Sequence, residues 1–254
     1  MITGASGGIG KELALVAAEN HNNLVLIARS EPGLQELCHF IRNKFNVQAD
    51  YFAMDLIEKG AAELLYKQTK EKGLNINYLI NNAGIGDYGN FIENEIQKVS
   101  NMINLNISAL TELTWYFANE MVKVGKGGVL NVASTASFQP DPFMAVYGAT
   151  KSYVANFTEA LSFELKDTGV TATVVSPGAT ETSFFKVAKM ADSKMMSTKM
   201  MKPEEVARTA YDAMMKGKLH VVPGLANKIL SFISSITPPI KLRLAIAAHI
   251  LKKE

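Results

Sequence analysis

The chain is 254 residues long, with 48% hydrophobic and 20% charged residues, which is typical of a soluble globular enzyme. Its 26 basic and 24 acidic residues give a net charge of +2, so no overall field favours nucleic acid or an acidic partner. The single cysteine, Cys38, excludes an intrachain disulfide, and the four histidines show no metal-ligand spacing. We therefore expect no nucleic-acid partner and no metal site.

The first residues run into a glycine-rich turn without a basic and apolar leader segment. No stretch of about 18 uninterrupted apolar residues occurs, which argues against a membrane-spanning helix. We expect a cytoplasmic protein.

Apolar, β-branched runs alternate with segments of helical period, the pattern of a parallel sheet with crossover helices. Strands are expected at Leu24–Ala28, near Gln48–Ala53, and at Tyr78–Ile80, Gly128–Val132, Val170–Val175 and Leu219–Val222. Helices are expected near Gly10–Glu19, Gly33–Phe45, Ala61–Lys72, Ile92–Val122, Tyr147–Lys166 and Pro203–Lys216. The sequence thus predicts a single α/β domain of the Rossmann type, a doubly wound and mostly parallel sheet in three α/β/α layers.

A glycine-rich turn, Thr3–Gly10, opens the first helix. Glycines permit a tight turn and a close approach of the backbone to a pyrophosphate, and the N-terminus of the following helix favours the anion. Taken alone, the turn also fits a structural loop without a ligand. Only Met1 and Ile2 precede it, whereas a strand usually has about five or six residues, so we expect the first strand to be truncated.

Four motifs in chain order resemble those of the short-chain dehydrogenase/reductase family. They are Gly4-x3-Gly8-x-Gly10, Asn81-Asn82-Ala83-Gly84, Tyr147-Gly148-Ala149-Thr150-Lys151, and Pro177-Gly178 with Thr182 four residues after the glycine. The resemblance implies contacts with a dinucleotide by Gly4, Ser6, Gly8, Ile9, Gly10, Asn82, Ala83, Gly84, Tyr147, Lys151, Pro177, Gly178 and Thr182. The whole chain is similar to a bacterial branch of oxidoreductases that resembles 3-oxoacyl and hydroxysteroid reductases.

The end of the second strand indicates which nicotinamide binds. A carboxylate there would bind the ribose 2′-hydroxyl of NAD and repel the extra phosphate of NADP. The position holds Ala28, followed by Arg29, and a guanidinium can bind phosphate through two hydrogen bonds. We therefore expect NADP(H), with a solvated surface arginine as the alternative for Arg29. The resemblance implies that Asp55 contacts the adenine, a role compatible with capping a helix.

Tyr147 and Lys151 are the expected acid–base pair. Carbonyl reduction needs a proton on oxygen as hydride reaches carbon, and a free tyrosine, with a pKa of about 10, needs help near neutrality. Lys151 lies four residues later on the same helix face, so we expect its ammonium to lower the pKa of the phenol. Lys151 is also expected to reach the hydroxyls of the nicotinamide ribose.

Ser134 and Asn106 complete the expected catalytic set. Ser134 follows the strand that ends at Val132, so its hydroxyl can hold the substrate oxygen. Ser137 competes for this role, and the spacing of the family selects Ser134. The resemblance implies that Asn106 lies at a local helix kink that holds a water linking the lysine to solvent, with Asn104 as the rival assignment.

The stretch after Thr182 is expected to cover the substrate. It contains Ser183, Phe184, Phe185, Met190, Met195, Met196, Met200 and Met201. Flexible methionines suit a bulky apolar substrate, and Phe138, Phe143 and Met144 would add to an apolar mouth. A helix that packs these methionines into the core is an equal alternative.

Residues 225–254 are expected to form an amphipathic helical extension of a catalytic, dinucleotide-binding domain at 1–224. Apolar residues recur at helical spacing up to Ile236, Pro238-Pro239 interrupts the pattern, and a second helix follows at Ile240–Leu251. Basic residues surround the second helix: Lys241, Arg243, Lys252 and Lys253. Such a pair can pack on its own domain, form an oligomer interface or lie on a membrane surface, and we expect one of the first two.

These features predict an NADP(H)-dependent oxidoreductase that interconverts a carbonyl and an alcohol on a bulky apolar small molecule, as a homodimer or homotetramer. One alternative is a nicotinamide-binding epimerase or dehydratase, whose chains are usually longer and differ in glycine spacing. Another is a non-catalytic NADPH-sensing protein, which would commonly lack the tyrosine or the lysine.

Overall fold

Seven strands form one parallel sheet in the computed structural model, which describes residues 1–188, 190, 200–236 and 239–251. The strands are β1 (Ile2–Thr3), β2 (Leu24–Ala28), β3 (Ala49–Ala53), β4 (Tyr78–Asn81), β5 (Gly127–Val132), β6 (Val170–Val175) and β7 (His220–Val221). Their order is β3-β2-β1-β4-β5-β6-β7. Strands β1 to β3 are added toward one edge of the sheet and strands β4 to β7 toward the other, so the strand order reverses between β1 and β4. Sheets of this kind bind ligands at such a switch point, at the carboxyl ends of their strands.

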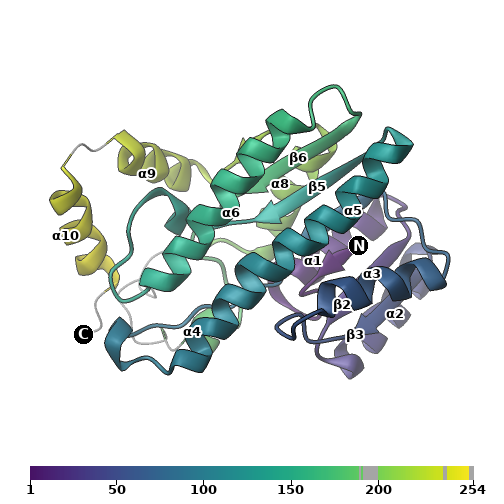
Figure 1. Ribbon diagram of the computed structural model, residues 1–254, viewed down its shortest axis with the longest axis horizontal. Coiled ribbons are helices and arrows are strands. Elements are labelled where there is room, and N and C mark those ends of the chain that lie inside the picture. The colour runs from purple at the N-terminus through teal and green to yellow at the C-terminus, as the bar shows by residue number, and fades with distance from the viewer. Residues whose placement is uncertain (189, 191–199, 237–238, 252–254) are drawn as a thin grey trace.

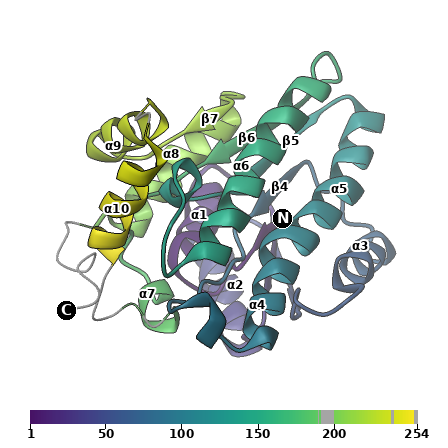
Figure 2. The same cartoon turned by 60° about the vertical axis from the view of Figure 1, so that its left-hand side comes forward.

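Helices cover both faces of this sheet (Figures 1 and 2). On one face pack α1 (Gly8–Glu19), α2 (Glu31–Phe45) and α8 (Pro203–Met215), and on the other α3 (Ala61–Glu71), α5 (Leu110–Val124) and α6 (Ala145–Glu164). All five residues of β2 are buried, because a strand covered on both faces must be apolar throughout. The predicted three-layer, Rossmann-type fold is confirmed.

One predicted helix, Ile92–Val122, is divided. The structure has a 3₁₀ turn at Phe91–Glu93, helix α4 (Ile96–Ile103), a π-helical segment at Asn104–Ala109, and then α5. The apolar spacing continues across the π-helical segment, so periodicity does not reveal it. Such bulges are frequent at functional sites, and this one coincides with the kink expected at Asn106.

β1 is short, as the sequence predicts. Its two residues, Ile2 and Thr3, are buried and pair with β2 and β4. Met1 is buried beside them, and its backbone nitrogen lies 2.7 Å from the Tyr78 carbonyl oxygen.

Two helices at the end of the chain, α9 (Leu225–Ile236) and α10 (Ile240–Leu251), lie outside the three layers at the left of Figure 1. A short helix, α7 (Phe184–Val187), precedes α8. Within the described ranges, no helix combines the length and the apolar character needed to cross a membrane. Pro238, Lys252 and Lys253 fall outside the described residues, as do Met195 and Met196.

Candidate active site

The glycine-rich turn connects β1 to α1 at the switch point of the sheet. Gly4 and Gly8 have φ of +67° and +53°, where an L side chain is strained. A Cβ at Gly10 would overlap the Gly4 carbonyl oxygen and the Asn82 amide. The N-cap residue of α1, Gly7, has no side chain and so supplies no side-chain acceptor for the first N–H groups of the helix. This cradle fits the pyrophosphate of a dinucleotide.

The motif after β4 is fastened to this turn. The Thr3 hydroxyl accepts hydrogen bonds from the backbone N–H groups of Asn82 and Ala83, both at 3.0 Å. The Asn82 side chain donates to the Thr3 carbonyl at 3.0 Å. A Cβ on Gly84 would lie 3.3 Å from Lys151 Nζ, so this glycine leaves room where the lysine and the motif meet.

Ser134, Tyr147 and Lys151 converge at the carboxyl end of β5. Tyr147 and Lys151 lie in the first two turns of α6, and Lys151 Nζ lies 5.8 Å from the centre of the Tyr147 ring. Ser134 caps the 3₁₀ turn that follows β5 and is hydrogen-bonded to the Tyr147 hydroxyl. Its competitor Ser137 donates to the Ser134 carbonyl at 2.7 Å. The geometry thus favours Ser134 as the hydroxyl beside the phenol.

Burial controls the pKa values of this pair. It raises the pKa of Tyr147 to about 12, more than the hydrogen bond with Ser134 lowers it, and the nearby Asp141 raises it further. Burial also lowers the pKa of Lys151 to about 8, while its Nζ donates to the Val132 carbonyl at 2.8 Å. That the Lys151 ammonium lowers the pKa of the phenol stays a prediction for the protein with a bound nicotinamide, whose positive ring would add to the effect.

Asn106 holds the π-helical segment against the site. Its side chain accepts from the Ile85 N–H at 3.0 Å, and donates to the Ile85 carbonyl at 2.9 Å and to the Thr150 hydroxyl at 3.0 Å. Asn106 is buried, whereas its rival Asn104 is exposed. Asn106 therefore ties the loop after β4 to helix α6, one turn from Tyr147.

Arg29 and Asp55 lie together at the far end of the crevice. Arg29 Nη1 is 3.8 Å from Asp55 Oδ2, and the arginine side chain is 66% exposed. Asp55 accepts from the Ile57 N–H at 3.0 Å, which caps a turn and not a helix, since α3 begins only at Ala61. Ser6 lies nearby, 3.6 Å from a Cβ built on Gly33 at the start of α2.

The segment after β6 closes over the glycine turn. A Cβ on Gly8 would lie 3.1 Å from the Thr182 methyl group, so Thr182 lies against the turn. The Pro177 carbonyl accepts from the Thr135 N–H at 2.9 Å. A Cβ on Gly178 would overlap the Asn227 side chain of α9, so packing against α9 also requires this glycine. Ile9 is partly buried and packs against the core beneath the turn.

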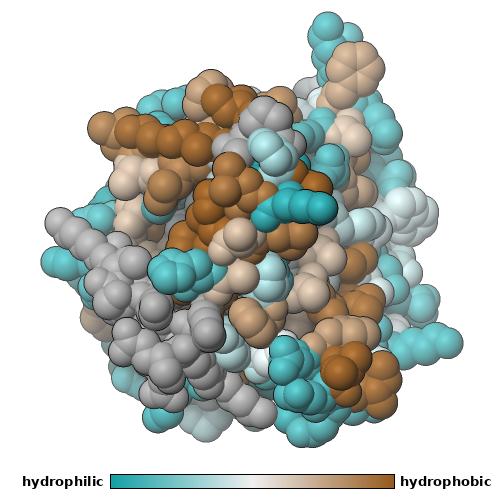
Figure 3. Space-filling model, turned by 90° about the vertical axis from the view of Figure 1, so that its left-hand side faces the viewer, coloured by the Kyte–Doolittle hydropathy of each residue, from teal (hydrophilic) through white to brown (hydrophobic). Residues whose placement is uncertain are grey.

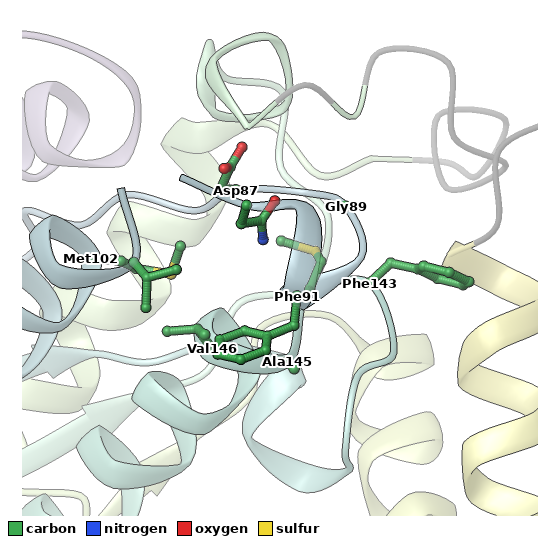
Figure 4. Close-up of a pocket in the computed structure, with 10 residues that line it drawn as sticks. Asp87, Gly89, Phe91, Met102, Phe143, Ala145 and Val146 are labelled. Carbon is green, nitrogen blue, oxygen red and sulfur yellow. The ribbon is translucent and has the colours of Figure 1, made fainter. Parts of the chain in front are cut away.

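Apolar side chains surround Tyr147. Its buried cluster contains Met102, Met144, Phe185, Ala188, Met190 and Leu251, and its ring centre lies 5.3 Å from that of Phe184. A small pocket, shown in Figure 4, lies between the loop that carries Asp87 and Gly89 and the start of α6 at Ala145 and Val146. The sequence left two roles open for the methionines, lining the substrate site or packing into the core. Buried Met190 fits both roles, because it belongs to a core cluster that also contains Tyr147.

Phe138 differs from the expectation. Its ring stacks on His220, with ring centres 5.4 Å apart, whereas Phe143 and Met144 join the cluster around the tyrosine. His220 is also one member of a polar chain that the sequence does not reveal. Its Nε2 is 2.8 Å from the Ser176 hydroxyl and its Nδ1 is 2.7 Å from Glu159. No local motif could reveal this chain, because its members lie on different elements far apart in sequence.

Asp141 was also missed. It is buried beside the first turn of α6, where a Cβ on Gly148 would lie 3.1 Å from its carboxylate. Gln139 donates to it at 3.2 Å, and burial raises its pKa to about 7. An aspartate in a loop is usually solvated, so composition and spacing gave no indication of its burial.

Known proteins are similar to this chain. Residues 1–193 match the family model for short chain dehydrogenase. The very-long-chain 3-oxoacyl-CoA reductase of Rattus norvegicus is 30% identical over 240 residues, which cover 91% of this chain and 74% of that protein. The Homo sapiens protein of the same name is 33% identical over 198 residues, which cover 74% of this chain and 61% of that protein.

Solved structures agree. A short-chain dehydrogenase from Sphingobium yanoikuyae in complex with NADPH is 29% identical, with a TM-score of 0.83 over 93% of this chain and 92% of that one. The bulky-bulky ketone specific alcohol dehydrogenase from Comamonas testosteroni is 28% identical, with a TM-score of 0.78 and the same coverage. With its fold, glycine turn and Ser134–Tyr147–Lys151 arrangement, this chain belongs to the short-chain dehydrogenase family.

Proposed function

We propose that the protein is an NADP(H)-dependent oxidoreductase that interconverts a carbonyl and an alcohol, with Tyr147 as the acid–base group. The observation that carries this proposal is the convergence of Ser134, Tyr147 and Lys151 beside the glycine cradle. Each residue type is common in proteins, but a hydroxyl, a phenol and a buried amine at the ligand-binding edge of the sheet supply what carbonyl reduction requires.

The chain's own residues divide the work of the reaction. A bound nicotinamide supplies the hydride chemistry. Ser134 orients the substrate oxygen, and Tyr147, protonated at neutral pH, gives its proton to that oxygen as negative charge develops there. The developing alkoxide is more basic than a phenolate, so a phenol with a raised pKa still transfers its proton. Lys151 would bind the hydroxyls of the nicotinamide ribose. Together with Asn106, it would also provide the path by which a proton from solvent returns to the Tyr147 hydroxyl.

The preference for NADP(H) rests on charge at the adenosine end. Ala28 leaves no carboxylate at the end of β2, and exposed Arg29 is available to a 2′-phosphate. Its ion pair with Asp55 is exposed and long, so a phosphate can replace it at small cost. Ser6 and the start of α2 lie at the same end. The NADPH complex of the Sphingobium yanoikuyae relative supports this choice.

The substrate is a bulky apolar carbonyl compound or the matching alcohol. The buried cluster around Tyr147 gives the reacting atoms an apolar surrounding. The Comamonas testosteroni relative is described as specific for bulky-bulky ketones, and the Rattus norvegicus relative as a reductase of very-long-chain 3-oxoacyl-CoA. Both descriptions support a large apolar group beside the carbonyl.

The assembly and the compartment belong to the same proposal. Helices α5 and α6 expose Trp115, Tyr153 and Phe163, an aromatic surface that suits packing of a second copy in a homodimer or homotetramer. The single cysteine, Cys38, is buried and free, which fits the cytoplasm. Residues 1–224 form the catalytic domain, and 225–254 the helical extension.

An NADPH-oxidation screen over aldehydes, ketones, quinones, 3-oxoacyl esters and steroids tests the proposal. We expect turnover of large apolar ketones, and loss of turnover with retained NADPH binding in Tyr147→Phe. Substrate isomerisation or dehydration without net NADPH consumption would support the epimerase or dehydratase alternative. Tight NADPH binding without turnover across the screen would support the NADPH-sensing alternative.

A further inference from the structure

Helices α9 and α10 expose a large apolar surface. Figure 3 views the molecule from the side that carries them and shows hydrophobic residues gathered there. Eleven large hydrophobic side chains of the pair are exposed: Leu225, Ile229, Leu230, Phe232, Ile233, Ile236, Ile240, Leu242, Leu244, Ile246 and Ile250. We call these residues the C-terminal patch. Apolar patches of this kind on soluble domains mark sites of association.

The domain itself covers little of the two helices. Ser231 is the buried residue of α9, and Ala247 and Leu251 are the buried residues of α10. Exposed apolar side chains surround α10 on several sides, and a helix of this kind is stable where something covers it. A helix of twelve residues is also marginal by itself in water. Self-packing, one of the outcomes expected from sequence, therefore leaves the patch uncovered.

The charge on this segment identifies what covers it. Residues 225–254 contain five of the 26 basic residues and one of the 24 acidic residues, so the segment has a net charge of +4 and the rest of the chain −2. Lys228, Lys241 and Arg243 flank the patch in the described helices. A two-fold contact between copies would bring these like charges together. An anionic surface complements them, and the aromatic surface of α5 and α6 remains available to a second copy.

We propose that α9 and α10 form a docking surface for an anionic lipid bilayer. The twelve residues of α10 span about 18 Å, whereas the hydrocarbon core is about 30 Å thick, so the helices lie in the plane of the interface. Arg243 Nη1 donates to the Ser234 carbonyl at 3.4 Å and holds α10 against the last turn of α9. The pair thus enters the interface as one unit.

The docking surface adjoins the mouth of the active site. The Ser234 hydroxyl of α9 donates to Gln139 at 3.1 Å, and Gln139 in turn donates to Asp141 beside α6. Leu251 of α10 packs in the same cluster as Tyr147 and Met144. In the docked protein, the apolar side chains around Tyr147 therefore lie on the side that faces the lipid. The consequence that a lipid-dissolved substrate enters there rests on the proposed function, whereas the docking itself does not.

Vesicle sedimentation tests the docking with the full chain and no substrate. We expect binding to vesicles of phosphatidylcholine with 30 mol% phosphatidylglycerol, at least tenfold weaker binding to phosphatidylcholine alone, and weakening by salt. The double variant Ile229→Ser/Phe232→Ser and the double variant Lys228→Glu/Lys241→Glu should each reduce binding at least tenfold. Matched controls are Leu64→Ser on α3 and Lys126→Glu at the opposite end of the sheet, which should bind like the wild type.

A fluorescence experiment locates the contact. Trp115 is the single tryptophan, so Trp115→Phe provides a background for one reporter at a time. Phe232→Trp in this background should shift its emission to the blue on adding anionic vesicles and be quenched by brominated lipids. Phe163→Trp should do neither.

Circular dichroism checks that each variant is folded, and light scattering checks its oligomeric state. Variants should keep the wild-type spectrum and melting temperature within a few degrees, and a variant that unfolds is replaced by single substitutions. Equal binding of wild type and patch variants, absence of vesicle binding, or dissociation of an oligomer by the patch variants would each overturn the proposal. Vesicle binding with no turnover of any carbonyl would leave docking intact and reject the proposed function.

Discussion

Lys151 Nζ donates to the Val132 carbonyl at 2.8 Å while it lies 5.8 Å from the centre of the Tyr147 ring. The buried amine is therefore anchored to the end of β5 and lies within reach of both the phenol and the crevice. Because burial lowers its pKa to about 8, its charge changes within the working range of an enzyme.

This position predicts the pH dependence of reduction. If the ammonium form of Lys151 assists proton transfer from the Tyr147 hydroxyl, the rate of reduction should fall as pH rises through about 8, where Lys151 loses its proton. Lys151→Met should reduce kcat/KM at least 100-fold, and Lys151→Arg, which keeps its charge, should retain some activity without the fall near pH 8. Steady-state rates from pH 6 to 10 measure this. A wild-type rate that is flat across pH 8 would contradict the role of the ammonium.

Asp141 predicts a change of stability with pH. Its folded pKa of about 7 exceeds the ordinary value of 3.8, so the folded state holds the proton more tightly. Protonated Asp141 therefore adds at most ~4 kcal/mol to the free energy of unfolding. This stabilisation is complete below about pH 4 and is lost as pH rises through about 7. Asp141→Asn keeps the shape without the charge, so it should raise the melting temperature at pH 8 and change it little at pH 4. Calorimetry at both pH values checks this, and an equal effect at both would contradict it.

Arg29 predicts the choice of cofactor. Arg29→Ala should raise KM for NADPH about tenfold to a hundredfold and leave KM for NADH nearly unchanged, because hydrogen bonds to charged groups contribute about 1.5–3 kcal/mol. Ala28→Asp should shift the preference toward NADH by adding the carboxylate that binds a free 2′-hydroxyl. The control is Lys44→Ala at the other end of α2. If the wild type already has the higher kcat/KM with NADH, the assignment of NADP(H) fails.

The Ser176–His220–Glu159 chain predicts a coupled effect on stability. His220→Leu should destabilise the fold by about 1–3 kcal/mol, because the fully buried Ser176 hydroxyl loses its partner. The double variant His220→Leu/Ser176→Ala should recover part of this loss, whereas independent residues would give additive costs. Chemical denaturation of the four proteins in this cycle measures the coupling. Strict additivity would show that the two side chains do not interact.

Much of the fold could be predicted from the sequence, because the strands are covered on both faces and must be apolar throughout. β2 and β6 appear at their predicted bounds, and β5 starts one residue early. The division of Ile92–Val122 could not be predicted, since the π-helical segment preserves the apolar spacing on either side. The motif residues could be predicted from their resemblance to the family's motifs, and the backbone requires glycine at two of these positions, Gly4 and Gly10.

The sequence by itself determined the family, the sheet, the glycine cradle and the identities of Tyr147 and Lys151, because each depends on residues close together in the chain. Only the tertiary structure decided that burial raises the pKa of Tyr147, that Asp141 is desolvated, and that α9 and α10 leave the C-terminal patch exposed. These properties depend on how much water distant segments exclude around a group, and a local pattern of residues does not contain that quantity.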